Sequence, residues 1–493
     1  MIISQDKRGS IGPGRKLSIA VTFRASRGGL GPVACRRSGK DISIRNMRPT
    51  KSMVQSAVRA LRRLGFEVSG RGNVSVSVRG SRRSFERAFN TKLTTMSLNQ
   101  PAGTIVSADS VYFPAADAPW EENPRLAKVI DDAYIQWPHI YMNQRFDRDE
   151  PSPLSLQLRL SYHHLDVPEV SVLLNAERAH RDGITGRDIR VAMIDSGFAH
   201  THPYFVERGY NTRTVLAGTA TQVDQDGNGH GTGESANLLG MAPDVEFIGI
   251  KLDNESDPTG GATILEGFQE ALQHDPHVIS VSLGFDLRDG NTGRPLTQLP
   301  NSLIALEAEI QAAVASGIVV VFSAGNGHIT FPGMMPEVIS AGGVFVDPNG
   351  RMEASDYASA FTSQIYPGRR VPDYSGLVGR ASNGAAYIAL PIPEGCAIDV
   401  AQAMVDGSQP NDGWGVFSGT SAAAPQLAGA CALLLQRNPG LTPADVGQAL
   451  AQSARRVRFG AANPASNPGR PPLRGAAATG AGLIDVHAAL QLV

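Results

Sequence analysis

Three short segments of this 493-residue chain hold side chains that could together perform nucleophilic catalysis. Asp195 ends the apolar run 191–194, His230 stands between two glycines, and Ser421 begins a helix-like apolar segment. A serine hydroxyl attacks a carbonyl efficiently only when a base takes its proton. An aspartate that accepts the imidazole Nδ1–H holds that base in the required tautomer. We therefore expect Ser421 as nucleophile, His230 as base and Asp195 as the orienting acid.

Each of these segments also has a structural interpretation when taken alone. A Gly-Thr-Ser sequence such as 419–421 is commonly a helix cap. A carboxylate at a strand end often forms a turn, and a lone histidine at a helix start is more often structural. Glu234 lies one helical turn beyond His230 and could contact it, although we favour a first-turn acid that stabilises the helix dipole.

The elements expected around these side chains would bring them to one edge of a sheet. Near-continuous apolar strands separated by helices favour a parallel sheet with helices on both faces, an α/β fold. Functional residues of such sheets gather at the carboxyl ends of the strands. The predicted strands are 189–194, 245–251, 278–282, 318–322 and 338–346, and the predicted helices are 262–274 and 302–316.

The first part of the chain has a different texture. After a flexible basic lead at 1–15, the pattern predicts strands and helices in the order β-α-β-β-α-β, with the last strand near Leu93. We therefore predict a small α+β, ferredoxin-like domain over 16–110. A Pro-rich connector that could hold a processing site follows at 111–165, and the larger domain occupies 166–493.

Charge is divided unevenly between these regions. Residues 1–90 contain 20 lysines and arginines but four carboxylates, a net charge of +16, which leaves −17 on the remainder of a chain with net charge −1. A basic region of this kind could bind nucleic acid or a membrane. It could also dock on its own acidic remainder. We favour self-docking and expect no nucleic-acid partner.

Composition narrows the possible classes of protein. A hydrophobic content of 42% describes a folded chain, and three scattered cysteines are too few for a disulfide framework or a zinc site. No run of about 18 apolar residues predicts a transmembrane segment. The N-terminus lacks the apolar region of a secretory signal. We expect a protein that is cytoplasmic at synthesis, with export by a non-Sec route left open.

Six motifs carry a resemblance to a known family. Over 166–493 the chain resembles the subtilisin-like (subtilase) serine peptidases, and its Asp-His-Ser order is the order of subtilisin. The motifs are Ile194–Gly197 with His202-Pro203, Gly229–Thr232, Val281–Gly284, Ser323–Gly327, Gly419–Pro425 and Gly480–Asp485.

This resemblance implies further roles. Asn326 would supply a side-chain donor to the oxyanion, beside the Ser421 backbone N–H. The segments Ser282-Leu283-Gly284 and Ser323-Ala324-Gly325 would line the channel for a protein or peptide substrate. No cofactor is expected for the chemistry. Subtilases often bind calcium through scattered carbonyls, which the sequence does not locate, so any metal site is unknown.

The segment 65–93 resembles the prodomains of the subtilisin and sedolisin groups, which implies an inhibitory prodomain and a zymogen. Two further stretches, 368–373 and 414–425, are similar to sedolisins, which use Glu, Asp and Ser. His230 within Gly-His-Gly-Thr decides for the subtilase mechanism. The sequence thus predicts a serine endopeptidase controlled by its prodomain. A catalytically silent, peptide-binding pseudoprotease is the alternative.

Overall fold

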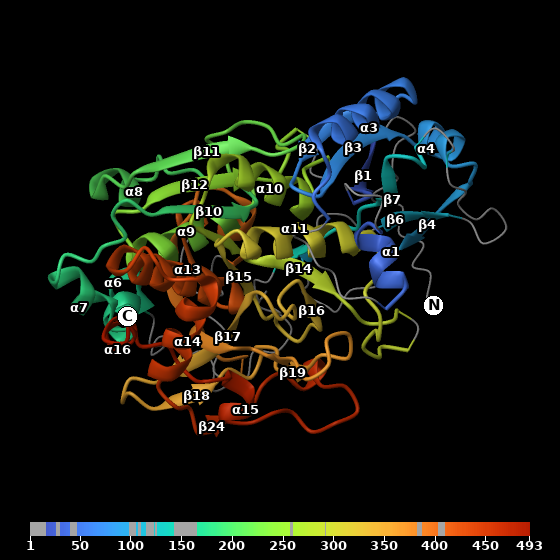
Figure 1. The fold of residues 1–493 in the computed structure, drawn as a ribbon. Helices are drawn as coiled ribbons and strands as arrows, with labels where there is room; N and C mark the ends of the chain where they lie inside the picture. The colour runs from blue at the N-terminus through green and yellow to red at the C-terminus, as the bar shows by residue number, and fades with distance from the viewer. Residues whose placement is uncertain are drawn as a thin grey trace.

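The structure is a computed structural model that describes residues 16–25, 30–39, 47–97, 105–106, 110–114, 123, 126–141, 165–256, 260–290, 292–381, 387–402 and 410–493. We call the described residues 16–135 the N-terminal unit and 165–493 the C-terminal unit. Figure 1 shows the N-terminal unit, in blue to teal, beside helices α10 (Ile264–Ala271) and α11 (Ile304–Ala315). No described helix is both long and apolar enough to cross a membrane.

The N-terminal unit is built on an antiparallel four-stranded sheet. Its strand order is β2-β3-β1-β7. Two helices, each begun by a hydroxyl cap from Thr50 or Ser81, pack on it around a core that includes Phe85 and Phe89. The elements are β1 (Lys16–Phe23), α3 (Lys51–Arg63), β2 (Glu67–Arg71), β3 (Ser75–Ser81), α4 (Arg82–Ala88) and β7 (Ile130–Ile135).

The fourth strand of this sheet is not the one that the sequence predicts. The strand near Leu93, β4 (Leu93–Ser97), pairs with β6 (Ser110–Pro114) outside the four-stranded sheet. The edge of β1 is covered instead by β7, which lies in the region expected to be a connector. The polar sequence Ile-Asp-Asp-Ala-Tyr-Ile hides β7 from a hydrophobicity pattern, since only Ile130 and Ala133 are buried. A further short helix, α1 (Pro32–Arg37), lies between β1 and α3.

The C-terminal unit has the predicted α/β architecture around a nine-stranded sheet. The order is β11-β12-β10-β13-β15-β17-β18-β24, and β21 also pairs with β17. From β11 to β17 all neighbours are parallel. The strands are β10 (Arg190–Asp195), β11 (Thr212–Leu216), β12 (Glu246–Lys251), β13 (Val278–Val281), β15 (Val319–Ser323), β17 (Ile339–Val346), β18 (Met352–Ala354), β21 (Tyr374–Leu377) and β24 (Phe459–Gly460).

Helices cover both faces of this sheet, as the continuous apolar strands predict. Val191 and Met193 of β10 pack into one core with α9 (His230–Met241) and α13 (Thr420–Arg437). Their neighbours Ala192 and Ile194 point to the opposite face and pack with α10 and α11. The remaining helices are α6 (Val167–Leu173), α7 (Ala176–Arg181), α8 (Pro203–Arg208), α12 (Ala397–Gln402), α14 (Pro443–Ser453), α15 (Ala476–Thr479) and α16 (Val486–Leu490).

Three smaller sheets complete the described structure. One of them has the order β16-β14-β8-β5 and joins the two parts of the chain. In it β8 (Ile140–Tyr141), from the expected connector, pairs antiparallel with β14 (Leu283–Asp286) of the C-terminal unit. The other short strands are β5 (Ile105–Val106), β9 (Leu165–Asp166), β16 (Thr330–Phe331), β19 (Phe361–Thr362), β20 (Arg370–Val371), β22 (Ile388–Pro391) and β23 (Trp414–Phe417).

Candidate active site

Asp195 and His230 meet at the carboxyl end of the central strand. Asp195 is the last residue of β10, and His230 is the first residue of α9. His230 Nδ1 lies 2.7 Å from Asp195 Oδ1, and both side chains are fully buried. The same oxygen accepts the Ser196 N–H at 2.7 Å. The carboxylate therefore has a fixed orientation, and a proton on Nδ1 leaves Nε2 as the basic nitrogen.

A glycine permits this close approach. A Cβ on Gly231 would lie 2.3 Å from the Gly197 carbonyl oxygen and 2.9 Å from the Asp195 Cβ. Both distances are shorter than real carbon contacts allow, so a side chain here would push α9 away from β10. The glycine after His230 thus sets the distance between histidine and aspartate.

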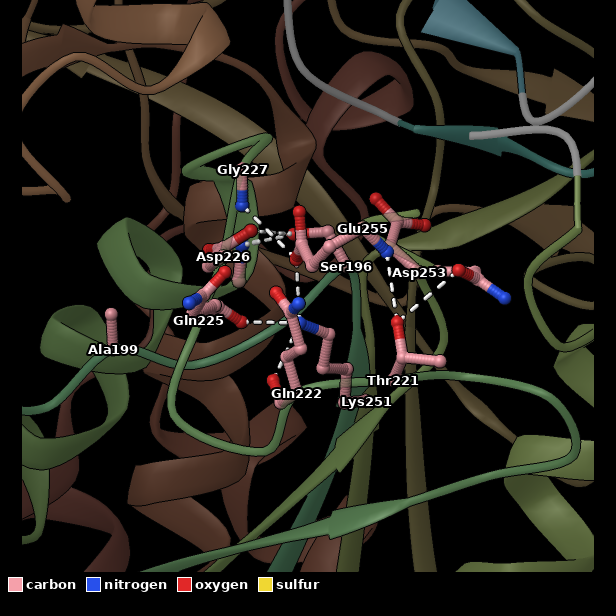
Figure 2. A network of polar contacts seen from close by, with 12 residues as sticks. Ser196, Ala199, Thr221, Gln222, Gln225, Asp226, Gly227, Lys251, Asp253 and Glu255 are labelled. Atoms are coloured by element: carbon pink, nitrogen blue, oxygen red, sulfur yellow. Dashed lines mark hydrogen bonds and ion pairs between the residues drawn. The ribbon is translucent and has the colours of Figure 1, made fainter. Parts of the chain in front are cut away.

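A second carboxylate, Asp226, holds the start of α9 in place. Its Oδ1 accepts the Gly229 N–H at 3.0 Å and the Ser196 hydroxyl at 2.9 Å. Its Oδ2 accepts both the N–H and the hydroxyl of Thr232, at 2.9 and 2.7 Å. Figure 2 shows Asp226 beside Ser196 in this polar network. Burial raises the pKa of Asp226, and its hydrogen bonds oppose that rise. No role for Asp226 was predicted from the sequence, and the signal that could have found it is an aspartate shortly before a helix start, where it can accept the first N–H groups.

Opposing effects act on the imidazole. Burial lowers the pKa of His230, while the charge and hydrogen bond of Asp195 raise it, and Glu234 and Asp226 add to the rise, so it stands at about 9. Glu234 is fully buried and lies beyond the first turn of α9, so it is not the first-turn acid that the sequence favoured. Its Oε2 accepts from Asn237 at 2.9 Å, and its Oε1 has no hydrogen-bond partner among the described residues. Burial raises the pKa of Glu234 to about 8.

Ser421 lies in the first turn of α13, after Gly419, whose φ is +126°. Its hydroxyl donates to the Ser282 carbonyl at 3.4 Å, and its own carbonyl accepts the Ser282 hydroxyl at 3.0 Å. His230 Nε2 has no hydrogen-bond partner in the described part of the chain. Catalytic hydrogen bonds are often long or misaligned before substrate binds. The ring of Phe417, four residues before Ser421, lies 6.4 Å from the His230 ring.

Asn326 is fixed against the residue before Ser421. Its Oδ1 accepts the Thr420 N–H at 3.0 Å and the Thr420 hydroxyl at 3.1 Å. Because both contacts use the oxygen, the Nδ2 donor points away from Thr420. The start of α13 and the amide of Asn326 are therefore held together.

The two predicted substrate segments have different surroundings. Leu283 and Gly284 lie opposite Tyr141 and Ile140 in an antiparallel strand pair. In the other segment, Ser323–Gly325, the Gly325 N–H donates to the Thr420 hydroxyl of α13 at 3.0 Å. Segment 282–284 pairs with an extended piece of chain, and the predicted role of 323–325 in substrate binding stays a prediction.

Among the His, Cys, Asp and Glu side chains of the described residues, which are the candidate metal ligands, no three or more lie together. The three cysteines, Cys35, Cys396 and Cys431, are buried free thiols.

Comparisons with known proteins agree with this architecture. Subtilisin E of Bacillus subtilis (strain 168) is 27% identical over 299 residues, and AprX, a serine protease of the same strain, is 30% identical over 311 residues. These alignments cover 57% and 56% of this chain and 64% of each relative, just under two thirds of its length. Fervidolysin from Fervidobacterium pennivorans, a keratinolytic enzyme related to subtilisin, superposes with a TM-score of 0.55 at 17% identity.

The fervidolysin superposition covers 98% of this chain and 62% of that one, and at this identity it shows the fold alone. The family assignment comes from the sequence. The model of the subtilase family matches residues 186–471, more than half of the chain. The matched stretch contains Asp195, His230, Asn326 and Ser421, and this chain belongs to the subtilase family.

Proposed function

We propose that this protein is a serine endopeptidase that hydrolyses peptide bonds through an acyl-enzyme intermediate. The observation that carries the proposal is the 2.7 Å contact between His230 Nδ1 and Asp195 Oδ1, at the sheet edge where Ser421 begins a helix. A buried imidazole oriented by a carboxylate is the base that a serine nucleophile requires.

In this mechanism the Ser421 hydroxyl turns from the Ser282 carbonyl to His230 Nε2, which takes its proton as Oγ attacks the peptide carbonyl. Asp195 keeps the Nδ1 proton in place and stabilises the imidazolium that forms. His230 then gives the proton to the leaving amine. Water attacks the acyl-enzyme in the same way and regenerates Ser421.

Negative charge on the tetrahedral oxygen would be met by two donors. The Ser421 N–H lies in the first turn of α13, where backbone N–H groups lack helical partners. The Asn326 amide is oriented by Thr420, as its Oδ1 contacts show. Preorganised donors of this kind lower the barrier because they need no rearrangement during the reaction.

The protein's own chain indicates how a substrate would bind. Tyr141 and Ile140 pair with Leu283 and Gly284 as an antiparallel strand. The ring of Tyr141 lies 5.4 Å from the ring of His230. Strand pairing recognises the peptide backbone, so it accepts many sequences. We propose that β8 occupies the substrate position and that self-processing cleaves the chain shortly after Tyr141.

The N-terminal unit would then act as an intramolecular inhibitor. It is anchored on α11 by Glu309, whose carboxylate accepts the N–H groups of Asn73, Val74 and Ser75 at 2.7–2.9 Å. On α10, Glu266 forms a buried ion pair of 2.7 Å with Arg79. These contacts support the proposal that the basic region docks on its own acidic remainder.

Expression of the full chain beside its Ser421→Ala variant tests the function. The wild type should appear as a shorter mature chain by intact mass, with a new N-terminus soon after Tyr141, while the variant stays full length. A fluorophosphonate probe should label wild type and not the variant. A folded wild type that neither shortens nor reacts with the probe would favour a silent, peptide-binding pseudoprotease.

A further inference from the structure

Asp253 is placed by the same strand ends that place the catalytic aspartate. Strands β10 and β12 are parallel neighbours in which Asp195 lies opposite Lys251. Beyond these strands the chain stays in register, because Leu252 N–H donates to the Asp195 carbonyl and Asp253 N–H donates to the Ser196 carbonyl, both at 2.9 Å. The position of Asp253 relative to the triad is therefore fixed by main-chain bonds.

The side chain of Asp253 contacts Tyr141 of β8, the strand proposed to occupy the substrate position. The Tyr141 hydroxyl donates to Asp253 Oδ1 at 2.5 Å. Tyr141 is 3% exposed, with its ring edge-on to His230 on one side and its backbone paired with Leu283 on the other. A side chain in this position thus has its base near the reacting histidine and its tip at a carboxylate.

The ammonium of Lys251, two residues before Asp253 in the chain, is bonded to groups other than Asp253. Lys251 is fully buried, and its ammonium donates to the carbonyls of Gln222 and Gln225 and to Glu255, at 2.5–3.0 Å. Figure 2 shows this cluster beside Asp253. Lys251 therefore balances the charge of Glu255, and Asp253 has the Tyr141 hydroxyl as its side-chain partner.

The electrostatic environment of Asp253 favours a donor from the substrate. Burial raises the pKa of Asp253 to about 7, the Tyr141 hydrogen bond lowers it, and the charges of Asp226, Asp195 and Glu255 raise it further. Asp253 is half-buried and lies near three other carboxylates. A hydrogen-bond donor is therefore needed to stabilise its charged form.

We infer that Asp253 is a specificity-determining residue of the proposed peptidase, which selects peptides whose side chain in the Tyr141 position carries a hydrogen-bond donor at its tip, as tyrosine does. The inference rests on the proposed function and names the substrate class of the same cleft. A site built to bond a hydroxyl discriminates strongly against an analogue without it, because the buried acceptor is then left unpaired.

Two matched peptides test the selection. They carry the sequence around Tyr141 and differ only in tyrosine or phenylalanine at that position. The mature wild-type enzyme should cleave the tyrosine peptide with a kcat/KM about tenfold higher, the effect of one hydrogen bond to a charged group. In Asp253→Leu, which keeps a similar volume, the ratio should fall to about one. An equal rate for both peptides in wild type, or an unchanged ratio in the variant, would overturn the inference.

A second experiment separates this inference from the proposed activity. In full-length Ser421→Ala, which needs no catalysis, hydrogen exchange of the β8 amides reports how tightly the segment is held. Tyr141→Phe and Asp253→Leu should each speed that exchange about tenfold, and the double variant should be no faster than either single one.

Tyr134→Phe serves as the matched control. Tyr134 lies in β7, and its hydroxyl donates to Asp132 of the same strand at 2.8 Å and not to Asp253. It should leave β8 exchange unchanged. Additive effects of the two cleft substitutions would contradict a direct contact between Tyr141 and Asp253, whether or not the enzyme is active. If the wild type neither reacts with the probe nor processes itself, the proposed peptidase function is overturned. Non-additive effects of Tyr141→Phe and Asp253→Leu would still support the contact between the two side chains.

Discussion

Two buried glutamates show how differently the proposed reaction centre and the docking face, the surface of α10 and α11 that contacts the N-terminal unit, are built. Both Glu309 on α11 and Glu234 on α9 are fully buried. The oxygens of Glu309 accept four hydrogen bonds from the N-terminal unit, three from backbone N–H groups and one from the Ser75 hydroxyl. Glu234 accepts from Asn237 alone, and its other oxygen has no partner among the described residues.

The difference fits the two proposed roles, docking at α11 and catalysis at the start of α9. A buried carboxylate with a full set of donors holds two surfaces together in one geometry. A buried carboxylate with few donors is destabilising, and such groups persist where the surroundings tune a functional side chain. Glu234 raises the pKa of His230, whereas Glu309 contacts no part of the triad. Changes at the two sites should therefore separate chemistry from docking.

The largest effect should come from the reaction centre. Asp195→Asn keeps the shape of the side chain but no longer stabilises the imidazolium or holds the required tautomer, so kcat/KM for a peptide substrate should fall about 10⁴-fold. Self-processing should slow to a similar degree and leave the chain full length. Initial-rate kinetics and intact mass over time check this.

The docking face should be indifferent to that change. We expect hydrogen-exchange protection at 73–75 in Asp195→Asn to match that in Ser421→Ala, because these residues contact Glu309 and not the triad. Loss of protection at 73–75 would show that the two regions are coupled, contrary to the division drawn above.

A smaller effect should follow from Glu309→Gln. The amide replaces one acceptor oxygen with a donor that faces backbone N–H groups. The N-terminal fragment, which is the part of the chain that self-processing after Tyr141 would release, should therefore bind the processed enzyme about 100-fold more weakly. Peptide hydrolysis by the separated enzyme should not change. Titration of inhibition by the fragment measures the affinity.

Glu270→Gln is the matched control, because this carboxylate on α10 pairs with His274 at 3.2 Å rather than with the N-terminal unit. An affinity loss of equal size in Glu270→Gln would mean that overall charge, and not the Glu309 contacts, determines docking. The glycine Gly72 supports the specific contact, since a Cβ there would lie 2.2 Å from Glu309 Oε1.

The same contrast shows what could be predicted from sequence. Asp195, His230 and Ser421 were predicted from local motifs, because strand ends and helix starts are short-range features and parallel strands bring their carboxyl ends together. Glu309 and Glu234 follow no such rule. Whether a glutamate on a helix is buried, and what it meets, depends on segments more than 200 residues away in the chain, as the contact of Glu309 with Ser75 shows.

Dependence on distant segments of the chain also explains what could be predicted of the N-terminal sheet and of the surroundings of Tyr141. The two helices of the predicted β-α-β-β-α-β order are found at 51–63 and 82–88, because their caps and apolar spacing are local signals. Strand β7 was not predicted, since its partner β1 lies over 100 residues earlier and its own sequence is polar. Asp253 was missed for a related reason: a carboxylate after a strand end gives no sign that Tyr141 will lie beside it.

A third prediction concerns the pH dependence of stability in the reaction centre. The pKa of Glu234 is about 8 in the folded protein, against an ordinary 4.5 when unfolded. Below pH 4.5 the group is protonated in both states and contributes nothing. Between these values the unfolded chain releases a proton that the folded protein keeps, so the folded state loses up to about 1.4 kcal/mol per pH unit.

Glu234→Gln removes this term and can keep the Asn237 bond through its carbonyl oxygen. From pH 6 to pH 7 the unfolding constant of wild type should therefore rise by up to about tenfold relative to the variant, measured by denaturant unfolding in Ser421→Ala. Equal pH slopes would show that Glu234 is already ionised in the folded protein. In active enzyme the acid limb of kcat/KM should move to lower pH, because one charge that raises the pKa of His230 is gone.

The smallest effect should be that of salt on docking. The charges of +16 on residues 1–90 and −17 on residues 91–493 attract over long range, and ions screen this attraction beyond about 8 Å at physiological ionic strength. The ion pair that joins Arg79 to Glu266 is 8% and 0% exposed, so ions reach it poorly once the complex forms. Salt should therefore slow association and leave dissociation almost unchanged.

Raising NaCl from about 0.05 to 0.5 M should weaken binding of the N-terminal fragment about fivefold, nearly all of it in the association rate measured by stopped flow. Glu309→Gln should show the same salt response from its weaker starting affinity. Glu309 is only one of the many charges that produce the long-range attraction, whereas its four hydrogen bonds stabilise the bound complex. A faster dissociation at high salt would place the main binding energy in exposed ion pairs, and the buried carboxylates of the docking face would then be secondary.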